Sequence, residues 1–550
     1  MTSAGRDRVI VPPFGRERVG AIAIAAMAMV VMIVPNLDYV PLWDGRVYAN
    51  CVMEAAFSGI TAESLRCAGH PSQGWALVLA IPQLFAPGSV AVLLLTNLAL
   101  GIVAVAAFRV VLSRVFPDSA HARELDLVAI ACAVHPVVLS TLVQPNVDFG
   151  VYVFFLVALA GLLTSSTMGT LTALIGGTLL VFSKETGVVA YGAAVAAALG
   201  AEHLRSGVPL RQRLAGVFRR GALLSLPVVL FGVDVIVWSA THGGSAIWKH
   251  TWQQSSTDGF NFFDLSEPIF VSYAAGLAVL GFMWVLWLPV AVDIAVGLGR
   301  MARRQATRVV EAADTPALIA VTVMTAGLAY VLTSFRTWSN LRYFALLYPL
   351  FLVLAYASLH RLGARAAFRR ATLAAIVLLF VIANFRSVDP LSRLVYGTFN
   401  TGVHKMYRMS SITGEFRGPG RDQLVYNLQF TGYHHVQNTL LRQIRPTDST
   451  VIATARHVRW NIWTQLRTTT FARSMRRDSV FSPTYADEVD VAARRSPEAW
   501  FLEFSNRDDD DHALATLLPR YRIADSIVVV SHGQRLVAHH LVRREAAVLP

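Results

Sequence analysis

Charged side chains stand close to the ends of apolar stretches at several points of this 550-residue chain. A carboxylate in such a position suits general-base catalysis on a hydroxyl group, whereas Lys and Arg suit the binding of a phosphate group. Ionisable groups at the edge of a membrane bundle are costly unless they are solvated or used. The residues that combine these properties are Asp44, Asp148, Lys184, Arg336 and Arg342.

Each of these residues also has a simpler structural interpretation. Asp44 suits an interfacial cap, and it also suits the binding of a divalent metal ion or a cationic partner. Asp148 suits the N-cap of a helix, and Lys184 suits a local pair with Glu185. The two arginines suit snorkelling to the membrane surface. Both interpretations stay open for each residue, and no spacing motif identifies a metal site.

Further polar residues nearby are candidates for lining a cavity. His135 precedes Pro136 within an apolar stretch, so packing and function are both open for it. Asp234 lies inside another stretch, where a carboxylate is expensive to bury, and the sequence identifies no partner for it. The full set of cavity candidates is Asp38, His135, Glu185, Asp234 and Tyr343.

The elements that must position these residues are transmembrane helices. With 54% hydrophobic residues, 15% charged residues and a mean hydropathy of +0.49, the chain is not a soluble globular protein. Eleven stretches are candidates for crossing a bilayer. They lie at 19–36, 75–108, 126–143, 149–164, 169–183, 187–201, 221–240, 269–298, 314–334, 342–360 and 371–388.

Loop charges predict the orientation of these spans. The N-terminal tail and every second loop are rich in Arg, whereas the intervening loops, which hold Lys184 and Arg342, carry few cations. The N-terminus is therefore predicted in the cytoplasm of a bacterial cell, with a multi-pass domain in the inner (plasma) membrane. The predicted divisions are a cytoplasmic tail at 1–18, a membrane domain at 19–388 and an extracytoplasmic α/β domain at 389–550.

The outer loops carry structural signals of their own. The loop at 37–74 has apolar residues at helical spacing, which predicts a helix lying on the membrane surface. Cys51 and Cys67 fall in this loop, and an oxidising exterior favours a disulfide between them, with two free thiols as the alternative. The loop at 241–268 is rich in aromatic residues, as an interfacial belt or a binding platform.

The last 160 or so residues are polar enough for a small α/β unit. Four consecutive Asp residues at 508–511 favour a solvated helix N-terminus over a calcium loop. The net charge of +13 belongs mostly to the cytoplasmic loops, and no aromatic-basic stripe predicts a nucleic-acid partner. Strands are predicted at 450–455, 526–531 and 535–542, and helices at 496–504 and 511–518.

The order of the motifs resembles that of a known family. His135-Pro136 and Ser183-Lys184-Glu185-Thr186-Gly187 are similar to the His-Pro and Ser-Lys-Glu-x-Gly motifs of the cadherin-targeting transmembrane mannosyltransferases. The acidic residues of the first two outer loops and an Arg342-Tyr343 to Pro349 span extend the resemblance over residues 19–360. The family is the GT-C membrane glycosyltransferases, which include the protein O-mannosyltransferases and the aminoarabinose transferase acting on lipid A.

The resemblance implies a sugar transfer at the outer face of the membrane. The donor would be a polyprenyl-phosphate-linked sugar, Asp44 the general base, and Asp148 a second carboxylate that orients donor, acceptor or metal. Lys184 and Arg342 would hold the carrier phosphate, and a single attack would invert the anomeric carbon. Trp43-Asp44-Gly45 stands where many relatives have paired acidic residues, which leaves a requirement for a divalent metal ion open.

Two other classes of protein remain as alternatives. A transporter or flippase needs polar groups at mid-membrane and often inverted repeats, but here the polar clusters gather at one face. A structural assembly protein of the cell envelope explains an outer domain but leaves the outward Lys184 and Arg342 without a role. No Gly-rich phosphate loop, Walker sequence or Ser-His-Asp signature appears at convincing spacing, so ATP-driven chemistry is unsupported.

Overall fold

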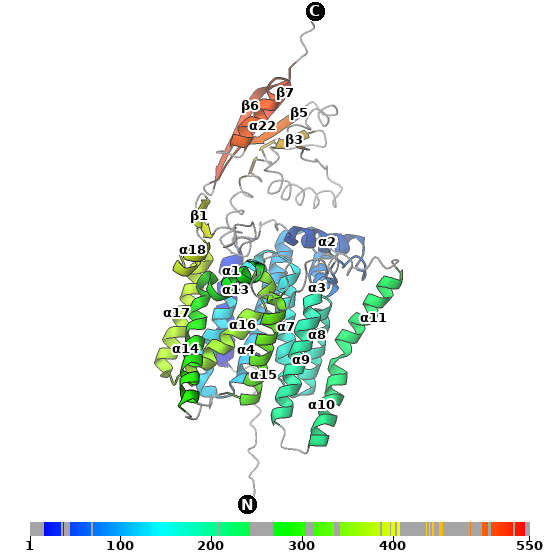
Figure 1. The fold of residues 1–550 in the computed structure, drawn as a ribbon. Helices are drawn as coiled ribbons and strands as arrows, with labels where there is room; N and C mark the ends of the chain where they lie inside the picture. The colour runs from blue at the N-terminus through cyan, green and yellow to red at the C-terminus, as the bar shows by residue number, and fades with distance from the viewer. Residues whose placement is uncertain are drawn as a thin grey trace, which may run out of the picture.

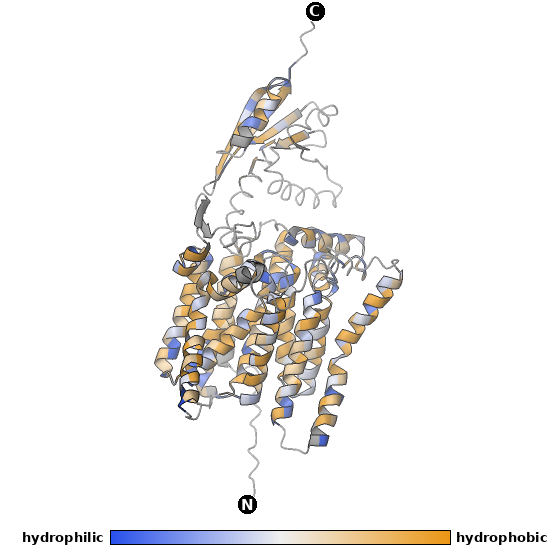
Figure 2. Cartoon of the chain, in the orientation of Figure 1, coloured by the Kyte–Doolittle hydropathy of each residue, from blue (hydrophilic) through white to orange (hydrophobic). Residues whose placement is uncertain are grey.

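The structure is a computed structural model, in which a helical bundle carries a small β-sheet beyond one of its ends (Figure 1). The apolar residues run along the length of the bundle helices (Figure 2). The bundle is described at 16–34, 37, 44–67, 70–205, 210–241, 268–303, 313–334, 341–385 and 388–396. The C-terminal region is described at 398–401, 404–407, 436, 439–440, 443–444, 450–454, 484–485, 498–503, 508–531 and 534–544.

Most of the described helices overlap the predicted apolar stretches, whereas the helices at Asp44–Ser58 and Pro390–Tyr396 and most of the helix at Leu210–Leu224 lie outside them. In chain order they are α1 (Arg16–Ile33), α2 (Asp44–Ser58), α3 (Gln73–Gln83), α4 (Val90–Val115), α5 (Ala122–Ala133), α6 (Pro136–Val143), α7 (Val147–Leu162), α8 (Thr167–Val181), α9 (Glu185–Arg205), α10 (Leu210–Leu224), α11 (Leu226–Thr241), α13 (Pro268–Val279), α14 (Met283–Ala302), α15 (Thr315–Thr333), α16 (Leu347–Arg361), α17 (Ala366–Phe385) and α18 (Pro390–Tyr396). Within the described part of the chain, short 3-10 helices lie at η2 (Ser119–His121), η3 (Leu280–Phe282) and η4 (Leu341–Phe344).

Within the described ranges, five helices are long and apolar enough to cross a membrane. Two bent pairs, α5 with α6 and α10 with α11, raise this number to seven. Shorter apolar helices lie at Gly20–Ile33, Val147–Leu162 and Thr167–Val181. The protein is therefore a multi-pass membrane protein, while the total of eleven spans stays a prediction. The predicted stretch 75–108 is divided between α3 and α4.

The breaks within the spans have identifiable causes. Pro136 cannot continue α5, and the chain bends by 49° there. At η3 both Gly281 (φ 63°) and Phe282 (φ 69°) are left-handed, which interrupts the span at 269–298. The buried carboxylate of Asp389 accepts hydrogen bonds from Phe282 N (2.8 Å) and Trp284 Nε1 (3.0 Å). Asp389, the first residue of the predicted outer domain, is thus hydrogen-bonded to the bundle.

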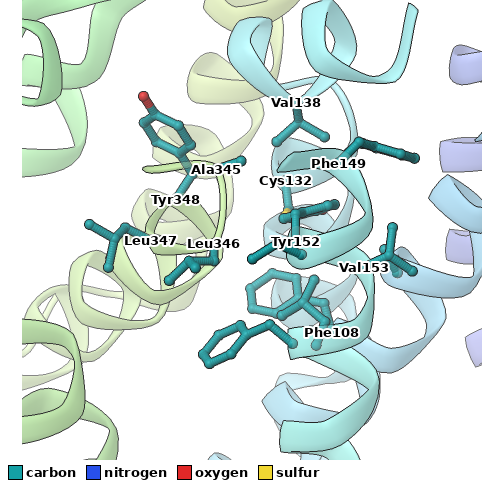
Figure 3. Packing of buried hydrophobic residues seen from close by; sticks show 14 of the residues in the cluster. Phe108, Cys132, Val138, Phe149, Tyr152, Val153, Ala345, Leu346, Leu347 and Tyr348 are labelled. Atoms are coloured by element: carbon teal, nitrogen blue, oxygen red, sulfur yellow. The ribbon is translucent and has the colours of Figure 1, made fainter. Parts of the chain in front are cut away.

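The centre of the bundle is tightly packed. Figure 3 shows Phe149 and Tyr152 of α7 among side chains of the neighbouring helices, including Phe108 of α4 and Leu346. Tyr152 Oη lies 3.3 Å from Cys132 Sγ, so this buried thiol is a core residue.

The C-terminal region contains a five-stranded sheet with the order β4-β3-β5-β7-β6, and a separate hairpin of β1 and β2. The strands β3, β6 and β7 and the helix α22 agree with the predicted positions. The strand bounds are β1 (Thr398–Thr401), β2 (His404–Tyr407), β3 (Thr450–Thr454), β4 (Thr484–Tyr485), β5 (Glu498–Glu503), β6 (Tyr521–Ser531) and β7 (Gln534–Arg543), and α22 is Asp508–Leu517. The Asp run begins this helix, as expected.

The helix predicted at 496–504 is wrong, because these residues form β5 between β3 and β7. Ala499 and Phe501 enter one apolar cluster, whereas Trp500 and Leu502 enter another on the opposite face of the sheet. A strand buried on both faces shows no polar-apolar alternation, so the local pattern resembles a buried helix.

Candidate functional site

Four charged residues from separate elements meet at the end of the bundle where α2 lies (Figure 1). Asp148 stands in the first turn of α7, and Lys184 precedes α9. The Lys184 ammonium donates to Asp148 Oδ1 at 2.6 Å. Arg342 of η4 donates through Nε to Asp148 Oδ2 at 3.2 Å, and its Nη2 donates to the carboxylate of Asp44 at the start of α2. We call these four residues the charge quartet.

The quartet is buried except for one member. The exposed fractions of the side chains are 2% for Arg342, 7% for Asp148 and 11% for Lys184, against 54% for Asp44. Both oxygens of Asp148 are engaged by cations, because Lys184 takes one and Arg342 the other. Asp44 is therefore the carboxylate that a reactant from outside reaches first.

Local sequence features hold these residues in place. Asn146 caps α7, since its side chain accepts from Asp148 N at 3.0 Å, so Asp148 is not the N-cap. A Cβ atom on Gly45 would lie 2.2 Å from the carbonyl oxygen of Gln144, so only Gly lets α2 approach this loop. A Cβ on Gly187 would likewise lie 2.2 Å from the carbonyl oxygen of Leu180.

Two tyrosines border the quartet. The Lys184 ammonium lies 4.2 Å from the ring centroid of Tyr343, and the Arg342 guanidinium lies 5.5 Å from it. Tyr48 of α2 is fully buried beside them, and burial, with the charges of Asp148 and Asp44, raises its pKa well above the usual value. Tyr48 is therefore a neutral hydroxyl group. No sequence pattern indicated Tyr48 as a site residue, although it lies one helical turn after Asp44.

Burial by itself lowers the pKa of Lys184, but the charge of Asp148, with smaller contributions from Tyr343 and Glu185, outweighs it. The net pKa of the ammonium is raised, so Lys184 is a cation at neutral pH. Lys184 lies in the short connection between α8 and α9, and Glu185 beside it does not pair with it as the local interpretation required. Glu185 accepts from His70 Nδ1 at 3.1 Å instead.

A second ion pair stands next to the quartet. Asp234 of α11, for which the sequence identified no partner, binds Arg66 at 2.6 Å and lies 3.4 Å from Gln73 Nε2. The Arg66 guanidinium also stacks on Trp238 at 4.1 Å. Arg66 lies in the loop that the disulfide between Cys51 and Cys67 closes. Arg66 and His70 were not predicted as site residues, because no periodic sequence pattern indicates either of them.

His135 is not part of this group. Its ring stacks on Tyr348 with centroids 4.0 Å apart, and Nε2 lies 3.1 Å from Met283 Sδ. Its Nδ1 accepts from Val137 N, which caps α6. The packing interpretation therefore holds for His135. Asp38, Arg336 and the aromatic loop at 242–267 lie outside the described residues.

The residues at the quartet do not fit a divalent cation on Asp148, since both of its oxygens face positive charges. Among the described residues, His121, Glu124 and His360 are close enough to share a metal ion. Arg369 donates to both Glu124 oxygens, at 2.8 and 3.1 Å, and so neutralises that carboxylate. Neither place is a convincing metal centre.

None of the protein-family models and none of the curated proteins matches the sequence. Among solved structures, ArnT from Cupriavidus metallidurans bound to undecaprenyl phosphate is 15% identical and superposes with a TM-score of 0.50, over 95% of this chain and 97% of that one. The apo form of ArnT gives 14% identity and a TM-score of 0.48, over 95% and 98% of the chains. AglB from Archaeoglobus fulgidus, in complex with an inhibitory peptide and a dolichol-phosphate, is 13% identical and gives a TM-score of 0.40, over 88% of this chain and 69% of that one.

The likeness to ArnT establishes the fold. The GT-C fold that the order of the sequence motifs indicated is thereby confirmed, while the bounds of the C-terminal domain stay a prediction.

Proposed function

We propose that the protein is a membrane glycosyltransferase that moves a sugar from a polyprenyl-phosphate carrier to an acceptor at the extracytoplasmic face. The observation that carries the proposal is the charge quartet, in which two buried cations and two carboxylates are interlocked at one end of the bundle. The fold agrees with this function, since ArnT was solved bound to undecaprenyl phosphate.

Asp44 is the general base in this proposal. It is the only quartet member whose side chain is more than half exposed, at 54%, and a carboxylate there accepts a proton from an acceptor hydroxyl. Asp148 is less suited to this step because Lys184 and Arg342 already engage both of its oxygens. Its role is to hold the two cations at a fixed separation.

Lys184 and Arg342 bind the carrier phosphate. Phosphate oxygens compete with carboxylates for a guanidinium group, and the exposed Asp44 is the partner of Arg342 that is most easily displaced. Arrival of the phosphate thus loosens the hold of Arg342 on Asp44 and leaves that carboxylate able to accept a proton. Arg336, from the connection before η4, is a further candidate for this phosphate.

The transfer is a single displacement. The acceptor oxygen forms a bond to the anomeric carbon as the bond from that carbon to the carrier phosphate oxygen breaks. Asp44 takes the hydroxyl proton, and the carrier phosphate leaves with the electron pair, stabilised by Lys184 and Arg342. The configuration at the anomeric carbon is inverted. The acceptor is a protein, a glycolipid or an envelope polysaccharide, and the C-terminal domain helps to hold it.

The test is a transfer assay on the purified protein with a panel of polyprenyl-phosphate sugars. Asp44→Asn is expected to lower the rate by about 10²- to 10⁴-fold while carrier binding is retained. Asp314→Asn is the matched control, because Asp314 caps α15 and pairs with Arg205, away from the quartet, and Asn also caps helices. Equal transfer rates for Asp44→Asn and the wild type would remove the proposed base. Transport of an intact carrier without sugar transfer would favour a flippase.

A further inference from the structure

The C-terminal sheet holds a second group of reactive side chains, separate from the charge quartet. Ser526 Oγ of β6 lies 2.8 Å from His539 Nδ1 of β7. On the other side of the imidazole, Nε2 lies 2.8 Å from Glu503 Oε2 of β5. A hydroxyl, an imidazole and a carboxylate are thus joined in one hydrogen-bonded line across three neighbouring strands.

The strand register explains why the three meet. Ser526 pairs with His539 across β6 and β7, so their side chains share one face of the sheet. His539 pairs with Phe501 of β5, and Glu503 lies two residues further along the same face. Phe501 packs there with Leu517 of α22. The line therefore stands on the face that carries α22. The sequence gives no signal for it, because its members come from three separate strands.

The carboxylate fixes the direction of the hydrogen bonds. An ionised carboxylate only accepts, so His539 must carry its proton on Nε2 when the imidazole is neutral. Nδ1 is then the acceptor, and the Ser526 hydroxyl donates to it. Serine hydrolases use this arrangement to activate the nucleophile, although here the two ring nitrogens have exchanged roles.

The surroundings of Ser526 suit an ester with an apolar acyl chain. The next residues on the same face of β6 are Val528 and Val530, with exposed fractions of 52% and 68%. Among the described strands β6 is at the edge of the sheet, so alternate backbone N–H groups of β6 point away from β7 and could donate to an oxyanion, although Ser526 N itself donates to Asp525 Oδ1 at 2.7 Å. A register shift between Ile523 and Asp525 lies directly beside Ser526.

We propose that Ser526, His539 and Glu503 form an esterase site that cleaves carboxylic esters with an apolar acyl chain. Ser526 Oγ forms a bond to the ester carbonyl carbon as its proton passes to His539 Nδ1. The bond between the carbonyl carbon and the alcohol oxygen then breaks, and the alcohol leaves with the proton from His539. Water then attacks the acyl-serine by the same route and releases the carboxylic acid. Glu503 is a positioning residue that holds the imidazole.

The direct test is labelling of the full-length protein in detergent micelles with a fluorophosphonate. Ser526 Oγ forms a bond to phosphorus, and fluoride leaves with the proton as hydrogen fluoride. Peptide mass spectrometry is expected to find the adduct on Ser526, with none in Ser526→Ala and a rate at least about tenfold lower in His539→Gln. His540→Gln is the matched control, since His540 is the next residue on β7 and stacks on Trp500 at 4.6 Å. It is expected to label at the wild-type rate.

Hydrolysis of p-nitrophenyl esters tests the acyl chain and Glu503. The octanoate is expected to be cleaved faster than the acetate, and Val530→Ser is expected to reduce this preference. Glu503→Gln is expected to lower kcat with little change in KM, as a positioning role requires. Sugar transfer is expected to be unchanged in Ser526→Ala, so the two sites are tested independently. Absence of an adduct on Ser526, or equal labelling of the wild type and His539→Gln, would overturn the proposal.

Discussion

Lys184 and Asp148, 36 positions apart in the chain, form an ion pair of 2.6 Å with both side chains at most 11% exposed. Removing two charges from water is expensive, and the cost is recovered only if each charge keeps its partners. Asp148 keeps two, because Arg342 approaches its second oxygen at 3.2 Å. The carboxylate is therefore the central member of the quartet, and its loss removes the ion pair of Lys184 and one of the ion pairs of Arg342.

Asp148→Asn is expected to destabilise the folded protein by about 3 to 5 kcal/mol, the cost of leaving buried charges uncompensated. The measurement is the thermal unfolding midpoint of the detergent-solubilised protein. Glu202→Gln is the control, because Glu202 is 43% exposed and its pair with Arg220 is expected to contribute about 1 kcal/mol or less. The double variant Asp148→Asn/Lys184→Met is expected to have a higher unfolding midpoint than Asp148→Asn alone, and so to regain part of the lost stability. If the midpoints of Asp148→Asn and Glu202→Gln are equal, the quartet does not stabilise the bundle.

The members of the quartet could be predicted from the sequence because each lies at the end of an apolar stretch. A topology in which alternate helix ends share one side brings Asp44, Asp148, Lys184 and Arg342 to the same face. Their pairing could not be predicted in this way, since Arg342 and Asp44 are 298 positions apart. Which cation meets which carboxylate depends on how the helices pack laterally, and hydropathy carries no information about that.

Other features of the structure could not be predicted from the sequence, for related reasons. Arg66 and Asp234 come from an irregular loop and from the middle of an apolar helix, so neither has a periodic pattern that indicates the other. The segment Glu498–Glu503 contains Glu, Ala and Leu, which favour a helix locally. Pairing with β3 and β7 overrides that preference.

The stabilising effect of Lys184 is expected to be independent of pH through the neutral range. Its pKa in the folded protein is raised above the usual 10.5, because Asp148 outweighs the opposing effect of burial. A lysine with a raised pKa contributes stability that is complete below the unfolded pKa and is lost as the pH rises through the folded pKa. The difference in unfolding midpoint between the wild type and Lys184→Met is therefore expected to stay constant from about pH 6 to about pH 9. A difference that shrinks within this range would contradict the raised pKa.

The disulfide between Cys51 and Cys67 is expected to hold the loop that it closes against the bundle. A closed loop of about 15 residues contributes roughly 3 kcal/mol in the chain-entropy model. Arg66, next to Cys67, is the loop residue that binds Asp234. In the double variant Cys51→Ser/Cys67→Ser, backbone amides at 59–67 are expected to exchange faster with deuterium, whereas those of α8 keep the wild-type rate. Reduction of the wild type is expected to give the same pattern, and unchanged exchange in both experiments would show that the loop is held by other contacts.

Gly45 is expected to control the position of the proposed base. The carbonyl oxygen of Gln144 lies 2.2 Å from the place where a Cβ atom would stand, and a backbone oxygen cannot rotate away as a side chain can. Gly45→Ala must therefore displace the start of α2 and move Asp44 relative to Arg342. A misplacement of about 1 Å can cost about 10²-fold in rate, so the expected result is a large loss in the sugar-transfer assay.

Gly192→Ala provides the comparison, because Gly192 lies within α9 and a Cβ atom there meets nothing within 4 Å. This variant is expected to keep full transfer and to gain about 0.5 to 1 kcal/mol in stability, since Ala favours a helix interior over Gly. Both variants replace a helical Gly by Ala, so a loss of sugar-transfer activity that occurs only in Gly45→Ala follows from the contact with Gln144. Full activity in Gly45→Ala would mean that transfer tolerates a displaced Asp44, and Asp44 would then not be the base.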